Sequence, residues 1–320
     1  MRTSTKFWII LASIFIISGV ILFSVVMAQN NWDFSKLNTS EFETNSYEIT
    51  EDFNSISFDT DTANIIFEVS EDGKCKVECY EDTKAKHTAT VEDDTLNIKV
   101  NNQKPWYSYI GINFNSPKVT VYLPKTEYNT LTIDESTGDV EIPTDFKFKE
   151  MKIDASTGNM MISASVSGNS EIHTSTGAIR IEDTSAGSLE LSTSTGDIVL
   201  TNVLCDGDIK TDVSTGRNDL TDVKCKNLTT DGSTGEIILT NVIATGKFDI
   251  NRSTGSVIFD GSDANEIFVD TSTGSVSGTL LTEKVFITDT SVGSVSVPKT
   301  ITGGRCEINT STGSIDIDIK

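Results

Sequence analysis

An aspartate or asparagine recurs four residues before the glycine of a repeated Ser-Thr-Gly phrase, and carboxylates at constant spacing can bind cations. If the repeats stack ~4.8 Å apart, like charges on neighbouring repeats repel unless water or a cation lies between them. Calcium, which takes carboxylate and carbonyl oxygens, is the apt cation. The aspartates at this position are Asp134, Asp154, Asp212, Asp231, Asp270 and Asp289, and the other repeats carry His173, Ser192, Asn251 and Asn309 there.

We nevertheless favour the interpretation in which this aspartate column binds no metal and no cofactor. The glycine-rich nonapeptide of calcium-binding β-rolls is missing from the sequence. Aspartate and asparagine side chains commonly hydrogen-bond nearby backbone groups in turns. The sequence therefore predicts turn caps for the Ser-Thr-Gly backbone, with calcium binding as the alternative.

The five cysteines offer one candidate bridge. Cys205 and Cys225 each stand nine residues after a repeat glycine, so stacking places them on neighbouring repeats. A spacing of ~4.8 Å lies within the Cα range of a disulfide, although the tight geometry favours two reduced turn residues. Cys75 and Cys79 point the same way along an expected strand but lie ~13 Å apart, and Cys306 takes a core position. The Cys-x-x-Cys spacing of metal ligands is absent.

Residue types for catalysis do not converge in the repeats, so we expect a protein that is not an enzyme. His87 and His173 are isolated, and the arginines fall at different repeat positions. A hydrolase or lyase needs an acid, a base and a cation at one place. Departures from the repeat, at residues 217–219 and in the aromatic loop at 106–109, are candidate binding places. The simpler interpretation is a local irregularity and a cap that packs its own core.

The elements that position these residues follow from the repeat. Its glycines are 19 or 20 residues apart, a period typical of solenoids. Apolar residues alternate with polar ones on both sides of each glycine, which predicts two short strands per repeat and a third near residues 202–204. Glycine permits the positive φ that a tight corner needs. The repeat glycines are Gly138, Gly158, Gly177, Gly196, Gly216, Gly235, Gly255, Gly274, Gly293 and Gly313.

We therefore predict an all-β protein, a parallel β-solenoid of about ten rungs, on the order of 50 Å long. The solenoid occupies residues 129–320 and an N-terminal β cap residues 46–128. Within the cap, residues 56–67 look like a degenerate rung with Ala63 in place of glycine. The last residues, 315–320, form an uncapped end whose charges guard the edge against pairing.

The N-terminal segment predicts a membrane anchor. Residues 7–28 are apolar or small and uncharged, long enough for a helix across a bilayer. A signal peptide cleaved after Ala28 is the alternative, but the apolar run is long for one. Arg2 and Lys6 place the tail at residues 1–6 in the cytoplasm and everything after the anchor outside. Residues 29–45 read as a linker.

The phrases Leu131-Thr-Ile-Asp-Glu-Ser-Thr-Gly-Asp-Val140 and Leu191-Ser-Thr-Ser-Thr-Gly-Asp-Ile198 carry a resemblance. Together with the anchor and the cap, the chain resembles the bacterial "putative adhesin" β-solenoid family, a domain of unknown function that includes YvlB- and LiaG-like proteins. The resemblance covers roughly residues 49–320. It implies a membrane-tethered extracytoplasmic protein, with some relatives linked to cell-envelope stress, and it brings no catalytic residues.

The net charge and the family resemblance together limit the possible functions. A net charge of −22 excludes nucleic acid as a partner. We expect a non-catalytic, single-pass protein of the bacterial cell membrane, an adhesin or scaffold that binds a cell-wall or envelope component. The alternative is a regulator or sensor of envelope stress that acts through a membrane protein partner.

Overall fold

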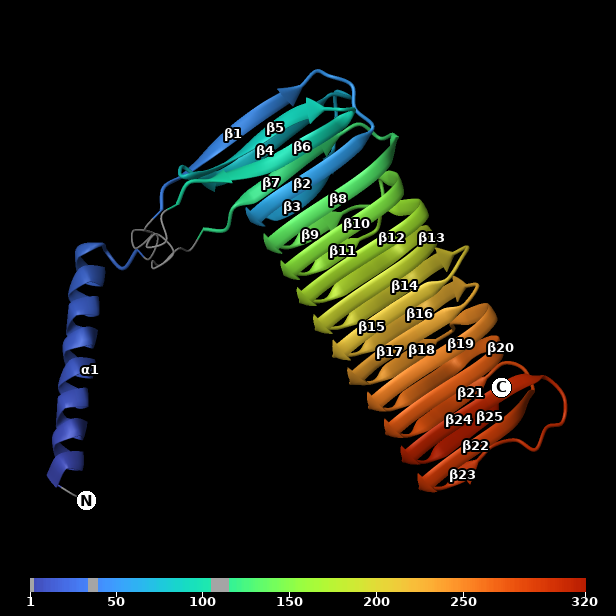
Figure 1. Cartoon of the computed structure of the whole chain (residues 1–320). Helices are drawn as coiled ribbons and strands as arrows, with labels where there is room; N and C mark the ends of the chain where they lie inside the picture. The colour runs from blue at the N-terminus through green and yellow to red at the C-terminus, as the bar shows by residue number, and fades with distance from the viewer. Residues whose placement is uncertain (1–2, 34–39, 105–114) are drawn as a thin grey trace.

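The computed structural model describes residues 3–33, 40–104 and 115–320, which form one helix and a long rod of stacked strands (Figure 1). The helix, α1 (Thr3–Gln29), leaves its long apolar stretch unburied. The rod is an all-β solenoid, which confirms the fold that the repeat predicts. The aromatic loop at residues 106–109 lies outside the described residues.

A typical rung begins with a strand that ends in Ser-Thr, turns at the glycine and continues into a second strand. The first rung is β2 (Ser55–Thr62) and β3 (Asn64–Val69), with Ala63 at the corner as the degenerate repeat predicts. The next rung stacks on it in parallel register, Phe58 opposite Ile133. The strands of the later rungs are β8 (Glu127–Thr137), β9 (Val140–Ile142), β10 (Lys147–Thr157), β11 (Met160–Ile162), β12 (Ser165–Thr176), β13 (Ile179–Thr195), β14 (Ile198–Cys205), β15 (Ile209–Thr215), β16 (Asn218–Cys225), β17 (Leu228–Thr234), β18 (Ile237–Thr240), β19 (Ile243–Thr254), β20 (Val257–Thr273), β21 (Val276–Leu280), β22 (Lys284–Val292), β23 (Val295–Ser296), β24 (Gly304–Thr312) and β25 (Ile315–Ile319).

The glycine corners stack directly on one another along the rod. Gly196 has a φ of +148°, which side chains rarely permit, and a Cβ there would lie 1.9 Å from the carbonyl oxygen of Gly177 in the preceding rung. A Cβ at the other repeat corners would meet the backbone of a neighbouring rung in the same way. Glycine is therefore required both by the backbone conformation and by the close approach of the rungs.

Besides the glycine corner and the corner that the repeat predicts at Ala186-Gly187 and Asp206-Gly207, a further corner lies six residues after the glycine, where the sequence did not predict one. Its residues bend the strand through a left-handed backbone, which aspartate and asparagine tolerate best after glycine. Beyond this bend runs the predicted third short strand, which at residues 202–204 is a continuation of β14. The non-glycine residues at this corner are Asp183, Asn202, Asp222 and Asn241, with φ between +52° and +55°.

The core is a column of aliphatic side chains inside the rungs. In the β8–β9 rung, Leu131, Ile133, Val140 and Ile142 are at most 1% exposed, as the alternation predicts. Asn218 is a polar exception.

The irregularity at Asn218 is a polar pair within this core. Asn218 is fully buried, and its Nδ2 donates a hydrogen bond to Thr230 Oγ1, 2.9 Å away. Thr230 itself stands where most rungs carry isoleucine or valine. Asn218 is therefore held inside the rod, although its Oδ1 has no hydrogen-bond partner in the described residues, and Arg217 beside it is exposed.

The cap extends both sheets of the first rung. On one side β6 (Thr95–Asn102) pairs in parallel with β2, and β5 (Ala85–Glu92) pairs antiparallel with β6. On the other side β7 (Lys118–Leu123) pairs in parallel with β3, followed by the antiparallel strands β4 (Cys75–Asp82) and β1 (Phe42–Ile49). The reversal of strand direction ends the parallel stacking.

Two boundaries differ from the sequence prediction. β1 begins at Phe42, inside the segment expected to be a linker, because it is an edge strand whose alternation is weak. The cap and the solenoid also form one continuous stack, since β2 pairs with both β6 and β8. The predicted boundary between residues 128 and 129 therefore marks the point where the repeat becomes regular, and it does not separate two domains.

The C-terminal rung is inserted into the stack, which corrects the prediction that the chain ends at the edge of the rod. β24 pairs with β20 on one side and with β22 on the other, and β25 likewise lies between β21 and β23. The terminal rung is therefore β22 and β23 (Figure 1). This position suits an edge, because Pro298, which has no N–H to donate to a further strand, follows β23.

Candidate functional site

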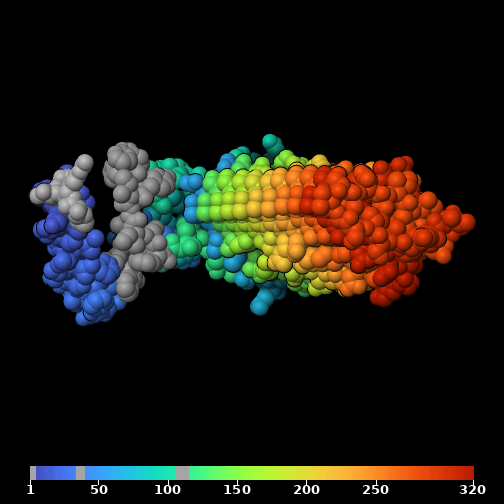
Figure 2. All heavy atoms as spheres, turned by 90° about the horizontal axis from the view of Figure 1, so that it is seen from below, coloured from blue at the N-terminus to red at the C-terminus, as the bar shows by residue number. Residues whose placement is uncertain are grey.

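The aspartate column lies on the outward face of the first strand of each rung, where its residues are exposed or half-buried. Figure 2 shows rows of atoms that run along the rod from rung to rung. Carboxylates are direct neighbours in two places, at Asp59, Asp134 and Asp154 and at Asp212 and Asp231. Elsewhere neutral residues separate them, and the inserted rung places Asn309 between Asp270 and Asp289.

The sequence prediction that this column caps the Ser-Thr-Gly corner is not what the described hydrogen bonds show. Within the described residues its hydrogen bonds run to the neighbouring rung, as from Asn251 Nδ2 to Asp231 Oδ1 at 3.0 Å. The residue directly after the glycine does the capping. Asp139 Oδ1 accepts a hydrogen bond from the backbone N–H of Asn159 at 2.7 Å, and Asp197 Oδ1 accepts one from Arg217 at 2.8 Å. Each cap therefore ties two rungs together.

The candidate disulfide is absent, because Cys205 and Cys225 are both free and buried. They follow Leu204 and Lys224, which are in parallel register. Register neighbours keep their Cβ atoms near the strand spacing of ~4.8 Å, longer than the ~3.8 Å that a disulfide needs. Burial raises the pKa of the Cys225 thiol to about 12, so the nucleophilic thiolate is disfavoured.

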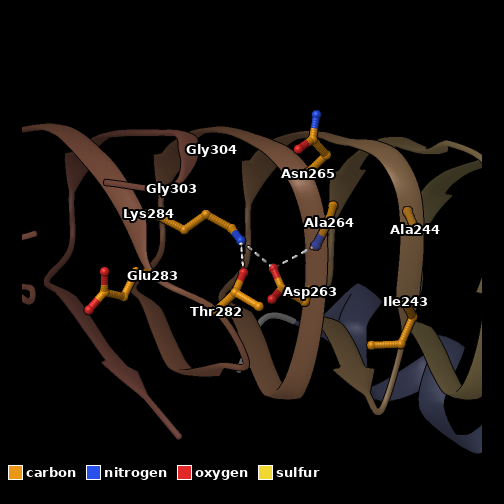
Figure 3. A pocket seen from close by; sticks show the side chains of 10 residues that line it. All are labelled: Ile243, Ala244, Asp263, Ala264, Asn265, Thr282, Glu283, Lys284, Gly303 and Gly304. Atoms are coloured by element: carbon orange, nitrogen blue, oxygen red, sulfur yellow. Dashed lines mark hydrogen bonds and ion pairs between the residues drawn. The ribbon is translucent and has the colours of Figure 1, made fainter. Parts of the chain in front are cut away.

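A pocket of about 520 Å³ lies at the inserted rung, and it holds a buried ion pair (Figure 3). Lys284 is 2% exposed, and its Nζ lies 2.6 Å from Asp263 Oδ1 and donates to Thr282 Oγ1. Lys284 is in register with Gly304 of β24, and Gly304 packs against the backbone of Asn265 in β20, where a Cβ would lie 1.7 Å from the carbonyl oxygen. The pair joins β22 to β20 across the inserted strand, a structural role.

A second buried polar cluster lies in the cap, where β4 leads into β5. Glu81 is fully buried and His87 is 2% exposed. His87 Nδ1 lies 2.6 Å from Glu81 Oε2, and the backbone N–H of His87 donates to the same oxygen at 2.5 Å. Asn45 of β1 donates to Glu81 Oε1 at 2.7 Å. The sequence prediction treated His87 as isolated, because its partner stands on the strand of the opposite sheet.

Cys79 completes this cluster. It stands two residues before Glu81 on β4, so both side chains point into the cap. A sulfur, carboxylate oxygen and imidazole nitrogen of Cys79, Glu81 and His87 all lie within 4.8 Å of one another, the only such convergence of three metal-ligating side chains in the described residues. The signal in the sequence is Cys-x-Glu on one strand and a histidine after the following turn.

A groove of about 910 Å³ also lies in the cap, at the turns that join β1 to β2 and β3 to β4. Its walls carry the carboxylates of Glu48, Glu51, Glu68 and Glu71 beside the rings of Tyr122 and Tyr128. Lys76 Nζ lies 4.3 Å from the centroid of the Tyr122 ring and pairs with Glu78, so this lysine is already engaged.

Among the described residues of the rod, Arg252 is a second buried cation. Arg252 is 3% exposed and packs over Gly232, where a side chain would clash with its guanidinium. Its Nη1 donates to the carbonyl oxygen of Val213 at 3.0 Å, and burial lowers its pKa. Arg252 faces the interior of the rod, while His173 is half-buried on the outward face and bonded to Ser192.

Comparisons with known proteins bear on the fold. Residues 53–220 match the family described as Toastrack DUF4097. No curated protein matches the chain.

Several solved structures resemble the chain at low identity. A "putative adhesin" from Parabacteroides merdae ATCC 43184 is 14% identical with a TM-score of 0.49, covering 88% of this chain and 98% of its own. A "putative lipid binding protein" from Parabacteroides distasonis ATCC 8503 is 20% identical with a TM-score of 0.48, covering 75% and 95%. A "putative adhesin" from Bacteroides fragilis NCTC 9343 is 16% identical with a TM-score of 0.42, covering 87% and 97%.

Proposed function

This chain belongs to the Toastrack DUF4097 family, and we propose that it is a non-catalytic bacterial surface protein that α1 anchors in the cell membrane. Its rod extends outside the cytoplasm and binds another component of the cell envelope, as an adhesin or scaffold.

The observation that carries this proposal is the constancy of the outward columns. Each rung presents polar side chains at the same positions, so the surface repeats at the strand spacing along the rod. Such a surface suits a partner that is long or repetitive, because one weak contact per rung adds up over many rungs. The buried ion pair of Lys284 and Asp263, by contrast, joins two strands inside the rod.

The anchor is the second part of the proposal. Within the described residues, α1 is the one helix long and apolar enough to cross a bilayer, and a signal sequence is the alternative. Arg2 and Lys6 precede the apolar run, which favours a cytoplasmic N-terminus. The rod would then stand on the outer side of the membrane.

A sedimentation experiment tests the binding. The full chain, purified in detergent, is mixed with isolated cell walls and with membranes, in calcium or in chelator, and the pelleted fraction is measured. We expect retention on walls. Loss of retention in chelator would support calcium at the run of Asp59, Asp134 and Asp154, where carboxylates are direct neighbours.

Matched variants locate the surface. Asp134→Asn with Asp154→Asn removes two charges from the aspartate column, at the run of neighbouring carboxylates, whereas Glu141→Gln with Glu182→Gln makes the same charge change on another face of the rod. A loss confined to the first pair places the contact on the column. Capture of one membrane protein, with walls left in solution, would favour the regulator of envelope stress, and binding to no envelope component would refute the proposal.

A further inference from the structure

We propose that Cys79, Glu81 and His87 form a binding site for one Zn²⁺ ion inside the cap. The site is independent of the proposed envelope binding, because it lies within the cap core and not on the outward columns. Thiolate, imidazole and carboxylate are the ligand types that zinc takes in proteins.

The geometry of the three side chains is close to what a zinc ion requires. Their ligand atoms lie within 4.8 Å of one another. Bonds of about 2.0–2.3 Å in a tetrahedron separate ligand atoms by about 3.3–3.8 Å. His87 Nδ1 and Glu81 Oε2, now 2.6 Å apart, must therefore separate by about 1 Å and exchange their hydrogen bond for two bonds to the ion, while the longer distances close by a similar amount. Changes of this size need only side-chain rotation.

A buried nitrogen without a partner is the second observation. His87 Nδ1 and Glu81 Oε2 are 2.6 Å apart, so Nδ1 is the nitrogen that faces the carboxylate and would bind the ion. In the described residues Nε2 has no hydrogen-bond partner although it is buried. An unsatisfied buried polar atom is costly, so without an ion this cluster is not a fully satisfied structural pair.

Charge favours a divalent ion. Zinc binds the thiolate, so Cys79 releases its proton when the ion enters. The thiolate and the Glu81 carboxylate then neutralise the two positive charges of the ion, which a buried site requires. A calcium ion would instead need six or more oxygens, and this cluster offers one carboxylate.

Position explains what the ion would do. Cys79 and Glu81 belong to β4 of one sheet and His87 to β5 of the other, and β1 covers the cluster through Asn45 and through Tyr47, whose hydroxyl donates to the carbonyl oxygen of His87 at 2.5 Å. A bound ion would join the two sheets at the outer end of the cap, where the stack has no further rung to pair with.

Cobalt is the probe. The full chain in detergent is stripped of metal and titrated with Co²⁺, whose bond to a thiolate gives a near-ultraviolet charge-transfer band and whose visible bands report tetrahedral geometry. We expect saturation at one equivalent, displacement by Zn²⁺ and a higher thermal midpoint in zinc. Absence of the thiolate band in the wild-type chain would overturn the proposal and leave a purely structural His–Glu pair.

Variants assign the ligands. Cys79→Ser and His87→Gln should each weaken binding by more than about 100-fold. Cys75→Ser is the control, since Cys75 is an equally free, buried cysteine on the same face of β4 but outside the cluster. An equal loss in the control would show that the metal binds elsewhere, whatever the effect of the variants on folding.

Discussion

Gly196 illustrates how a single residue determines the rung spacing. Replacing it with alanine would place a Cβ 1.9 Å from the Gly177 carbonyl oxygen, at a φ of +148°. Both rungs would have to separate, so we expect Gly196→Ala to cost more than about 4 kcal/mol or to prevent folding.

Gly73→Ala is the matched control for this prediction. Gly73 also has a positive φ, +73°, but a Cβ there meets nothing within 4 Å. Gly73→Ala should therefore cost only the free energy of placing a side chain in a left-handed backbone conformation, about 1–2 kcal/mol. Chemical denaturation of both variants measures the difference, and equal losses would show that rung contact adds nothing to the backbone term.

Glu135 makes the stability of the first rungs depend on pH. It is 1% exposed on β8, and its Oε1 accepts hydrogen bonds from the backbone N–H groups of Ala63 and Thr137 at 3.2 and 3.1 Å. Burial raises its pKa from 4.5 to about 8, against the two hydrogen bonds, which lower it. The folded protein therefore keeps a proton that the unfolded chain releases.

This difference in bound protons determines how stability varies with pH. Between about pH 4.5 and pH 8 the folded state holds more protons than the unfolded state, so stability falls as pH rises and is fully present only below that window. Glu135→Gln keeps the acceptor and removes the titration. We expect the variant to match the wild type near pH 4.5 and to exceed it by a few kcal/mol above pH 8, measured by denaturation at each pH. A constant difference between the two proteins would contradict the buried, protonated carboxyl.

Among the elements, the inserted rung makes the clearest prediction. β24 and β25 have hydrogen-bonded neighbours on both sides, whereas β22 and β23 have one each. Amides of β24 and β25 should therefore exchange with deuterium more slowly than those of β22 and β23, although they lie nearer the C-terminus. Sequential stacking would give the opposite order.

The buried pair of Lys284 and Asp263 holds this arrangement together. Lys284→Met leaves Asp263 as an unpaired buried charge, which should cost about 3 kcal/mol and speed exchange in β22. Adding Asp263→Asn removes the unpaired charge and should restore much of the loss. A double variant as unstable as the single one would show that packing of the lysine stem, and not charge, supports the rung.

The sequence could not reveal the insertion, for a physical reason. The rungs at Gly293 and Gly313 carry nearly the same local signals, so either would stack on the rung at Gly274. Their order depends on contacts distant in sequence, above all the reach of Lys284 past Gly304 to Asp263. The sequence did not predict the cluster of Cys79, Glu81 and His87 for the same reason, since the cluster forms only when two sheets face each other.

At the scale of the whole molecule, the periodicity of the sequence predicted most of the fold. Constant spacing of glycine predicted the corners, and alternation on both sides predicted the core, because each rung buries its apolar face only on its neighbours. The aspartate column lies on the outside of the rod. The turn cap that the sequence predicted for it is formed instead by the residue directly after the glycine, as Asp139 and Asp197 show. Spacing determines which face a residue takes, whereas hydrogen-bond partners depend on the corner geometry.

The last prediction concerns the anchor. Ile16 and Val20 lie in the middle of α1 with 66% and 60% of their surface exposed, so substitution leaves the rod untouched. An arginine near the centre of a membrane span costs about 2.5–3.5 kcal/mol, and two should abolish stable insertion. We expect Ile16→Arg with Val20→Arg to move the protein from the membrane fraction resistant to alkaline extraction into the soluble fraction. Ile16→Leu with Val20→Leu, which keeps the apolar surface, should stay in the membrane. Intact mass of the wild-type chain separates the two interpretations of the helix: a mass that includes residues 1–28 supports an anchor, and its loss after Ala28 would contradict it.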